Sequence, residues 1–489
     1  MIRKPTRGEV ACVPQPFQPG RRRFMQRSAL GAACIASAPL LASSGLASFD
    51  PASSSLVDAF GRPLADTSQS RADPIEWTAK ALRELLLLYL KLPFVPSGGI
   101  LSHLAALFIP IPGTSVEELW VKIIDARISE ALFNKVKQDL IGLTDVSTLY
   151  RNAVNANDPQ EIRETCIAVN VFFTGIVPGF QISGEEVPLL PLFAMGATLH
   201  LSLLHDIVLK GKELGFNDTS IANYQEELRR RIDGYTQYVD THVAAAIEKA
   251  RIDNPNIGTP LTRNMPLSAM LATKANLQVD VLDLRDTWYA FDAAKFPNGA
   301  TIKLDREILS PICGWWDLES TSPSKIPDWS APNSRLKDIR IWNNEQWRTS
   351  FLMGFSLDYE NDPTLETGKK IGQMLSKDVH NKYVSHVQGF YSAGVSTMVL
   401  HVQPDGTQHH FGSTDGDLDS LYSSSYADHC LSSIRSVGEG RSTGAAVNAV
   451  SGCIFGFQLI DQEAKPLSEA IRARIAQVSA PRLPNRLIR

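Results

Sequence analysis

Two adjacent runs without a charged side chain constrain the fold of this chain more than any other feature. Residues 165–184 and 187–205 contain no Asp, Glu, Lys or Arg, and only Glu185 and Glu186 separate them. At about 1.5 Å per residue, a helix over Val187–Leu209 could cross a ~30 Å hydrocarbon core, and a helix over Pro159–Ile176 has only marginal length for this. The mean hydropathy of −0.09 excludes a polytopic membrane protein. The runs therefore predict either the buried centre of a bundle or a hairpin of membrane length.

Apolar residues recur at helical spacing from residue 73 to about residue 293. Ser115 and Glu118 form a capping box, which predicts the start of a long helix with apolar residues from Leu119 to Leu140 along one face. The pattern predicts further helices over Trp77–Leu90, Ser97–Phe108, Pro159 to about Pro178, Val187 to about Leu214, Asn217–Ile247 and Leu267–Phe291. Long helices joined by short loops predict a bundle, with Val187–Leu209 surrounded by the other helices.

After about residue 297 the chain becomes richer in Ser, Gly, Thr and Asp, and a repeat appears. Five-residue segments starting at Leu336, Val384 and Leu431 are apolar at their first and fourth positions, and the fourth residues lie 48 and 47 residues apart. Each segment is followed by a second predicted strand, at 354–357, 398–401 and 456–459, and Pro404-Asp405-Gly406 is a turn signal. Three β units at a fixed period predict a β-prism with a pseudo-threefold axis, and a plain β-sandwich is the alternative.

The N-terminus has the pattern of an export signal. Arg21-Arg22, one further residue and Phe24 precede a mildly apolar run, and Gly45-Leu46-Ala47 supplies a small-x-small cleavage site. This pattern resembles a bacterial twin-arginine signal over residues 1–47 and predicts secretion or transfer to the periplasm. Residues 1–48 hold seven basic side chains and one acidic side chain, so their removal changes the net charge from −4 to −10. An acidic mature chain argues against nucleic acid as a partner.

Four further segments match one family in the same order. Phe180–Leu190 (FQISGEEVPLL), followed by Ala197–Leu201 and Leu204–Asp206, resembles the central-helix block of the insecticidal three-domain crystal (Cry) delta-endotoxins. Leu92–Gly99, Val281–Pro297 and Leu304–Ile308 resemble the break in that family's second helix, its seventh helix with the exit, and the start of its second domain. The resemblance covers about residues 73–310.

The resemblance implies a multidomain α and β fold: a seven-helix-type, pore-forming bundle followed by an all-β prism whose loops bind a receptor. The prism also resembles jacalin-type lectins, but Gly438–Val450 lacks the Asp of their sugar loop. Two features depart from the family. Phe296-Pro297-Asn298-Gly299 lacks the Tyr-Asp that usually follows, and a chain ending at Arg489 is expected to leave no room for a third, jelly-roll domain.

These observations divide the chain into six predicted segments. They are the export signal (1–47), a flexible leader (48–72), the pore-forming bundle (73–295), a linker (296–329), the receptor-binding β-prism (330–462) and a C-terminal tail (463–489).

The apolar hairpin, about residues 159–209, is predicted to insert into the target membrane. Its polar residues fall on one stripe of each helix, where they line water in an oligomeric pore or face polar neighbours in the folded bundle: Asn170, Thr174, Thr198, Ser202, His205 and Asp206. His200 lies nearly opposite the stripe and is expected to be a hydrogen-bonded core histidine. His205, beside Asp206, is a candidate to titrate near neutral pH and gate insertion.

Three aromatic residues near predicted prism turns are candidates for receptor contact, because aromatic side chains are enriched at binding hot spots: Trp347, Phe390 and Tyr391. Packing under a loop is the other interpretation. The expected partners are a target-cell membrane and a membrane receptor, either protein or glycan. We expect a monomer in solution, an oligomer in the pore, and no cofactor.

Other chemistries have weaker support. Asp280, Asp283 and Asp286 at i, i+3 and i+6 could hold Mg²⁺, but a solvated helix face explains them more simply. The sequence lacks serine-hydrolase, P-loop, zincin and dinucleotide motifs, so no enzyme is predicted. Cys430 and Cys453 could pair outside the cytoplasm. The alternative function is a secreted lectin-like binding protein with a purely structural bundle. A metal-dependent periplasmic hydrolase is the third candidate.

Overall fold

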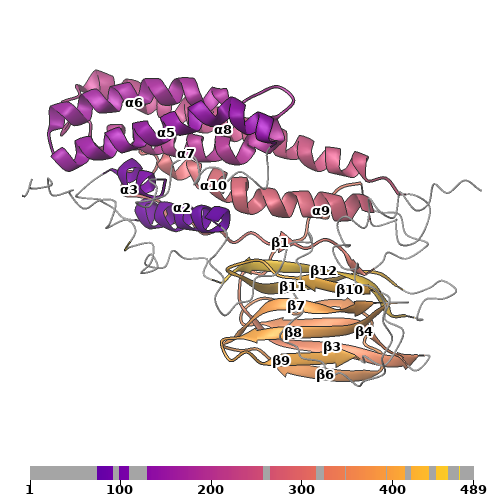
Figure 1. Cartoon of the computed structure of the whole chain (residues 1–489). Coiled ribbons are helices and arrows are strands. Elements are labelled where there is room, and N and C mark those ends of the chain that lie inside the picture. Colours follow the sequence, from indigo (N-terminus) through magenta and orange to yellow (C-terminus); the bar gives the residue numbers. More distant parts are fainter. Residues whose placement is uncertain are drawn as a thin grey trace, which may run out of the picture. The chain divides into compact units, whose positions relative to one another are not determined.

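The computed structural model describes residues 74–91, 99–108, 129–256, 265–314, 324–346, 349–391, 394–412, 420–439, 448–460 and residue 473 (Figure 1). These residues form a set of helices followed by three β-sheets, which confirms the predicted fold class. The predicted export signal, the leader, almost all of the tail and Trp347 lie outside the described residues.

Side-chain caps explain where several helices of the bundle begin. Ser129, Asp158 and Asn217 each accept a hydrogen bond from a backbone N–H of the following first turn. The described helical elements are α2 (Pro74–Lys91), α3 (Ile100–Ala106), α5 (Glu130–Ala156), α6 (Pro159–Gly179), α7 (Glu186–Lys210), α8 (Asp218–Asp253), α9 (Met265–Leu277), the π-helical turn η3 (Gln278–Leu282), α10 (Asp283–Arg285) and the 3-10 turn η4 (Trp288–Phe291).

Two predicted helices differ from the structure. The prediction of one continuous helix from Ser115 to Leu140 is wrong, because the backbone is extended at Ser129 (φ −66°, ψ 153°) and its side chain caps the start of a new helix there. The helix predicted over Leu267–Phe291 is interrupted by η3. This π-helical turn is accompanied by a buried hydrogen bond of 3.1 Å from Gln278 Nε2 to Asp283 Oδ1.

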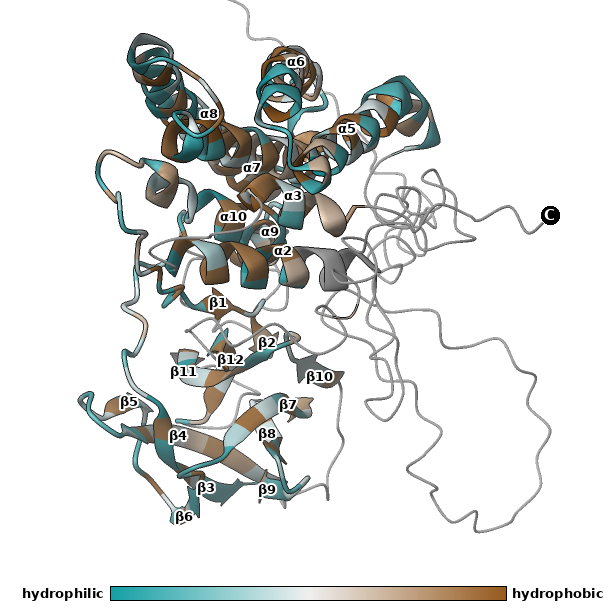
Figure 2. Cartoon of the chain, turned by 90° about the vertical axis from the view of Figure 1, so that its left-hand side faces the viewer, coloured by the Kyte–Doolittle hydropathy of each residue, from teal (hydrophilic) through white to brown (hydrophobic). Residues whose placement is uncertain are grey.

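Helix α7 forms the centre of the bundle. Every residue from 189 to 207 except Pro191 is buried, and α7 contacts α3, α6, α8, α10, η3 and η4. The outer helices α5, α6 and α8 are amphipathic, and hydrophilic residues (teal) lie on their outward faces in Figure 2. The predicted central position of Val187–Leu209 is therefore confirmed. A helix that is apolar on all sides needs such an enclosure to be stable in water.

The three sheets each contain four strands and are built around a hairpin, in agreement with the predicted prism. The central hairpins join β3 (Leu336–Gln346) with β4 (Thr349–Tyr359), β7 (Tyr383–Tyr391) with β8 (Val395–Gln403), and β11 (His429–Glu439) with β12 (Val450–Leu459). The flanking strands are β5 (Leu365–Gly368), β6 (Gln373–Asp378), β9 (Gln408–Gly412), β10 (Ser420–Ser424), β1 (Ile308–Leu309) and β2 (Cys313–Gly314). Inward-facing residues of the three sheets form one hydrophobic core.

Strands β1 and β2 lie inside the segment predicted to be a linker, residues 296–329. Both pair antiparallel with β12, so the third sheet includes residues that precede the predicted prism boundary at 330. Two-residue strands carry too little periodicity to be recognised in a sequence. The bundle therefore connects to the prism through a segment that is itself part of a prism sheet.

The structure does not bring Cys430 and Cys453 together, a pairing that the sequence left open. In the hairpin β11–β12, Cys430 is opposite Gln458 and Cys453 is opposite Ser436. Five residues of strand separate Gln458 from Cys453, a distance of about 17 Å, whereas a disulfide needs Cα atoms within about 7 Å. Neither of these two cysteines forms a disulfide in the structure.

Candidate functional site

The helical hairpin α6–α7 is the candidate site. Gly184, at a φ of +85°, permits the turn between the helices, and its N–H donates a 2.9 Å hydrogen bond to Oε2 of Glu186. At Gly196, α7 packs against the end of α6, where a Cβ would lie 3.3 Å from Phe180 Cε2 and 3.5 Å from Val177 Cγ2. Within the described residues, α7 is the single helix long and apolar enough to cross a membrane, and 83% of its most apolar window is buried.

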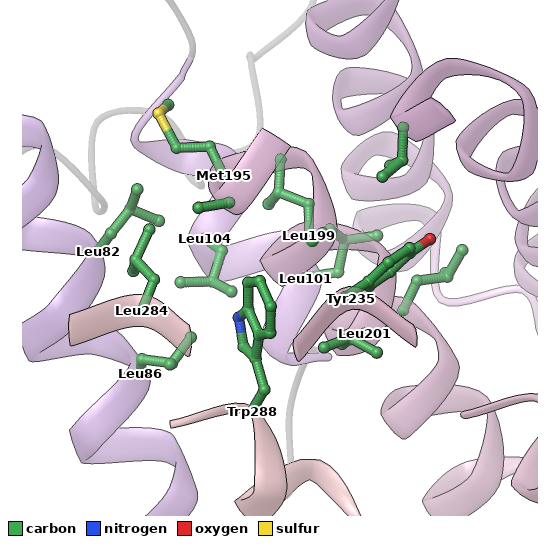
Figure 3. Close-up of a cluster of buried hydrophobic side chains, with 14 of the residues drawn as sticks. Leu82, Leu86, Leu101, Leu104, Met195, Leu199, Leu201, Tyr235, Leu284 and Trp288 are labelled. Atoms are coloured by element: carbon green, nitrogen blue, oxygen red, sulfur yellow. The ribbon is translucent and has the colours of Figure 1, made fainter. Parts of the chain in front are cut away.

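The apolar surface of α7 is covered by elements from across the bundle. Figure 3 shows Leu199 and Leu201 among side chains of α2, α3, α8, α10 and η4: Leu82, Leu86, Leu101, Leu104, Tyr235, Leu284 and Trp288. All of these side chains are buried. Burying one leucine side chain contributes about 1.5–3 kcal/mol, so leaving the bundle is costly unless α7 enters another apolar medium.

The polar stripe of α7 is buried and does not face water in this fold. Thr198 donates to Ala194 O at 2.8 Å and accepts a 2.9 Å hydrogen bond from Trp288 Nε1. Ser202 donates to Thr198 O at 2.7 Å. The structure thus assigns these hydroxyls to neighbours within the folded bundle, one of the two interpretations that the sequence left open.

Asp206 joins α7 to the first turn of α3. Its carboxylate accepts hydrogen bonds from Ile100 N at 2.9 Å, from Leu101 N at 3.1 Å and from the Tyr150 hydroxyl at 3.2 Å. A Cβ on Gly99 would collide with this carboxylate, so the close approach requires glycine. Burial raises the pKa of Asp206 to about 6, although the N–H of Ile100 and the charge of Lys210 oppose the increase. In the water-soluble fold Asp206 is therefore a cap for α3.

The hypothesis that His205 titrates near neutral pH is wrong for the water-soluble fold. The ring is buried against Phe291, with ring centroids 5.6 Å apart. Burial lowers the pKa of His205 to about 4, so the ring stays neutral above that pH. Its Nδ1 atom has no hydrogen-bond partner among the residues that the structure describes.

His200 is a hydrogen-bonded core histidine, as predicted. Its Nδ1 lies 2.7 Å from the Tyr235 hydroxyl, and its Nε2 lies 2.9 Å from Asn170 Oδ1. Because Asn170 Oδ1 can only accept, Nε2 carries the proton and Nδ1 accepts from Tyr235. The ring also stacks on Phe173, with 5.5 Å between centroids. Burial, and then the charge of Arg231, lowers the pKa of His200 to about 3.

The two stripe residues on α6 have different surroundings. Asn170 is half-buried and points to His200 across the hairpin, whereas Thr174 is exposed and donates to Asn170 O at 2.8 Å. Ile167 and Val171 are exposed on the same side of α6 as Thr174, at 43% and 68%. The outer face of α6 is therefore mixed, and the structure does not place Asn170 and Thr174 in one solvated stripe.

The three aspartates near η3 do not form a solvated face. Asp283 is buried, and its carboxylate accepts hydrogen bonds from Arg83 at 3.0 Å and from Arg306 at 2.5 and 2.9 Å. Asp286 pairs with Arg285 at 2.7 Å. No group of three or more potential metal ligands occurs in the described parts of the chain. The interpretation of Asp283 as part of a solvated helix face is wrong, because Arg83 and Arg306, which lie elsewhere in the sequence, pair with its buried carboxylate.

The same network reaches the prism. Arg306 Nη1 donates to His429 Nε2 on β11 at 2.7 Å, and His429 Nδ1 donates to Ala427 O at 2.5 Å. Beside it, Lys80 of α2 forms an ion pair of 2.6 Å with Asp428. Sequence reasoning missed this junction, because single arginines and histidines carry no periodic signal.

The candidate receptor residues that the structure describes lie at the end of a strand. Phe390 is opposite Leu421 and Tyr391 is opposite Ser420 in the β7–β10 pairing. Phe390 is half-buried, and Tyr391 packs partly against the prism core. Both residues precede the connection to β8, which starts at Val395.

Comparison with known proteins identifies the helical region. A family model described as delta endotoxin, N-terminal domain, matches residues 91–292. The helical region therefore contains the N-terminal domain of the delta-endotoxin family. Pesticidal crystal protein Cry1Ia of Bacillus thuringiensis subsp. kurstaki is 28% identical over 256 residues, which are 46% of this chain and 34% of the relative. Parasporal crystal protein Cry18Ca of Paenibacillus popilliae is 28% identical over 204 residues, 39% of this chain and 28% of the relative. The chain thus spans about a third of the length of these delta-endotoxin relatives.

Solved structures share the arrangement of a helical domain followed by β-sheets. Insecticidal delta-endotoxin Cry8Ea1 of Bacillus thuringiensis has a TM-score of 0.60 at 18% identity, covering 80% of this chain and 74% of its own. Insecticidal crystal protein Cry7Ca1 of the same species has a TM-score of 0.62 at 17% identity, covering 80% and 76%. PirB has a TM-score of 0.61 at 16% identity, covering 79% and 96%. These likenesses show that the delta-endotoxin fold extends beyond the bundle into the prism.

Proposed function

We propose that this chain is a pore-forming toxin of delta-endotoxin type, in which the α6–α7 hairpin enters a target membrane. The observation that carries the proposal is α7, an apolar helix of membrane length stored at the centre of a bundle of this family. Its 25 residues extend about 38 Å and the 21 residues of α6 about 32 Å, so both cover a ~30 Å hydrocarbon core. The alternative is that α7 is only a core helix, since a helix buried in a protein core can have the same apolar composition as one that enters a membrane.

Release of the hairpin would break a small set of polar contacts. Asp206 would leave α3 and Tyr150, Thr198 would leave Trp288, and His200 would leave Tyr235 on α8. The contact between His200 and Asn170 lies within the hairpin and would survive. In the pore, the freed stripe Thr198, Ser202, His205 and Asp206 provides the side of α7 that faces water.

A reversible cross-link tests whether α7 must leave the bundle. A Cβ at position 99 would lie 2.7 Å from Asp206 Cγ, so Gly99→Cys with Asp206→Cys brings two Cβ atoms within reach of the ~3.8 Å that a disulfide prefers. This bond ties α7 to the residue before α3. The variant is made in a background whose native cysteines are replaced by alanine, because Cys166 lies close enough to Asp206 to interact with it.

The matched control ties the hairpin only to itself. Val177→Cys with Gly196→Cys joins α6 to α7, since a Cβ at position 196 lies 3.5 Å from Val177 Cγ2. Dye release from lipid vesicles is measured from pH 5 to 10, before and after limited trypsin treatment. We expect the 99–206 link to suppress release, reductant to restore it, and the 177–196 link to leave release unchanged. Equal release with and without the 99–206 link would refute hairpin insertion, and a parent protein that never releases dye would favour the binding-protein alternative.

The finer parts of the proposal rest on the sequence and on the family. The prism binds a membrane receptor, protein or glycan, through loops near Trp347, Phe390 and Tyr391, and the soluble monomer becomes an oligomer in the pore. The named relatives are pesticidal or insecticidal, which supports an insect as the target. Residues 1–47 direct export, which is tested by fusing them to a reporter and replacing Arg21 and Arg22 with lysine. Retention of export in that double variant would remove the twin-arginine assignment.

A further inference from the structure

Two cysteines lie directly opposite each other where the connecting segment joins the prism. In the antiparallel pairing of β2 with β12, Cys313 is the register partner of Cys453, and Gly314 is the partner of Gly452. Register partners in an antiparallel sheet have Cα atoms about 4.5 or 5.5 Å apart and side chains on the same face. Disulfides join Cα atoms about 4.4–6.8 Å apart, so either kind of pair is within range.

The surroundings of the two thiols are consistent with close contact. A Cβ on Gly314 would lie 2.7 Å from Gly452 Cα, so the two strands approach as closely here as glycine allows. Both cysteines belong to the prism core and both are buried. Burial raises the pKa of Cys313 to about 12, and burial followed by the neighbouring Cys313 raises that of Cys453.

We propose that Cys313 and Cys453 form a redox pair, which closes to a cross-strand disulfide when the chain folds in an oxidising environment. The oxidant is a disulfide, either a small molecule such as oxidised glutathione or a protein. The thiolate of Cys313 attacks it and releases one thiol, and the thiolate of Cys453 then attacks Cys313 Sγ and releases the second. One S–S bond forms in the chain, the oxidant's S–S bond is reduced to two thiols, and the two cysteine protons pass to those thiols.

The bond would staple the junction between the bundle and the prism. Ile312, next to Cys313, packs between Leu267 and Met270 of α9 and Val437 and Ile454 of the prism. Its N–H donates to Ser268 Oγ on α9 at 3.2 Å. The disulfide would fix the strand that carries Ile312 to the last strand of the prism and would close a loop of about 140 residues, long enough for a large effect on the unfolded chain. The pairing does not depend on pore formation.

Thiol counting after refolding tests the pair. A background with Cys12→Ser and Cys34→Ser keeps the four thiols of the described region: Cys166, Cys313, Cys430 and Cys453. The reduced chain is first unfolded in urea, so that the oxidant can reach the thiols that are buried in the fold. It is then refolded in glutathione buffers that range from reducing to oxidising. Free thiols are then trapped with a maleimide and counted by mass spectrometry.

We expect two of the four thiols to disappear and one cross-linked peptide to contain residues 313 and 453. Cys313→Ser should retain all three remaining thiols, whereas the control Cys430→Ser, on the same sheet, should lose two. The urea midpoint should be higher for the oxidised parent than for the reduced parent. Four free thiols in the most oxidising buffer, or a cross-link through Cys430 or Cys166, would overturn the proposal. If Cys453→Ser does not fold, Cys313→Ser still tests the pair, because Cys313 lies on a strand of only two residues.

Discussion

Replacing Asp283 with asparagine should destabilise the junction of bundle and prism by about 3–5 kcal/mol, the usual cost of removing one partner from a buried ion pair. The carboxylate is 1% exposed, and the side chains of Arg83 and Arg306 are 8% and 13% exposed. Without the negative charge, two guanidinium groups face each other with little water. Burial alone would raise the pKa of Asp283, but Arg306, Arg83 and Gln278 together outweigh it, so the pKa lies below that of an exposed aspartate.

The lowered pKa gives the sign of the pH dependence. An aspartate whose pKa is lower in the folded state stabilises the fold above the pKa of the unfolded chain, and loses this contribution as the pH falls through the folded pKa. The difference between the parent and Asp283→Asn should therefore be full at pH 7 and small in strongly acidic solution. Urea unfolding at both pH values, followed by far-UV circular dichroism and by tryptophan fluorescence, measures the difference.

An exposed pair provides the control for this prediction. Asp240 lies 2.5 Å from Arg285 in an ion pair whose carboxylate is 44% exposed, and Asp240→Asn should cost at most about 1 kcal/mol. A loss in Asp283→Asn no larger than that in Asp240→Asn would refute the argument from burial. So would an equal difference from the parent at both pH values.

Three further predictions concern the attachment of α7. Because burial raises the pKa of Asp206 to about 6, the parent should lose stability as the pH rises from 4 to 6, where the carboxyl of the unfolded chain ionises before that of the folded chain. Asp206→Asn should lack this loss, and urea titrations that show the same pH dependence in both proteins would disprove the prediction. Gly99→Ala should lower the melting temperature measured by calorimetry, because its Cβ meets Asp206. Gly175→Ala should raise the melting temperature, because a Cβ there meets nothing within 4 Å. A higher melting temperature in both variants would contradict the contact at position 99. Thr198→Val should cost about 1–3 kcal/mol by leaving Trp288 Nε1 unpaired, and a double-mutant cycle with Trp288→Phe should show strong coupling rather than additive losses.

Much of the fold follows from patterns that are local in sequence. The charge-free stretch over 187–205 indicated the buried central helix because an uncharged helix has no face that suits water. The repeat of about 48 residues indicated three hairpins because each sheet repeats the same alternation of apolar residues, and the observed strands β3, β7 and β11 contain the predicted segments. His200 was assigned to the core from its place on the helix, opposite the polar stripe.

Contacts between distant residues were not available from such patterns. Asp283 lies 200 residues from Arg83, and Arg306 lies 123 residues from His429, so their meeting depends on how the bundle and prism pack. The same holds for Asp206 with the first turn of α3, and for Cys313 with Cys453. The sequence left the partner of Cys453 open, because strand register is set by the whole sheet.

The sequence by itself therefore determined which segments are helices or strands, which helix is central, and which family the bundle resembles. These properties depend on periodicity and apolar content, which neighbouring residues carry. The tertiary structure decided which polar groups pair inside the core, where α7 is attached, and which cysteines face each other. Those pairings depend on distances between segments that only packing brings together, and they decide what must break before α7 can leave the bundle.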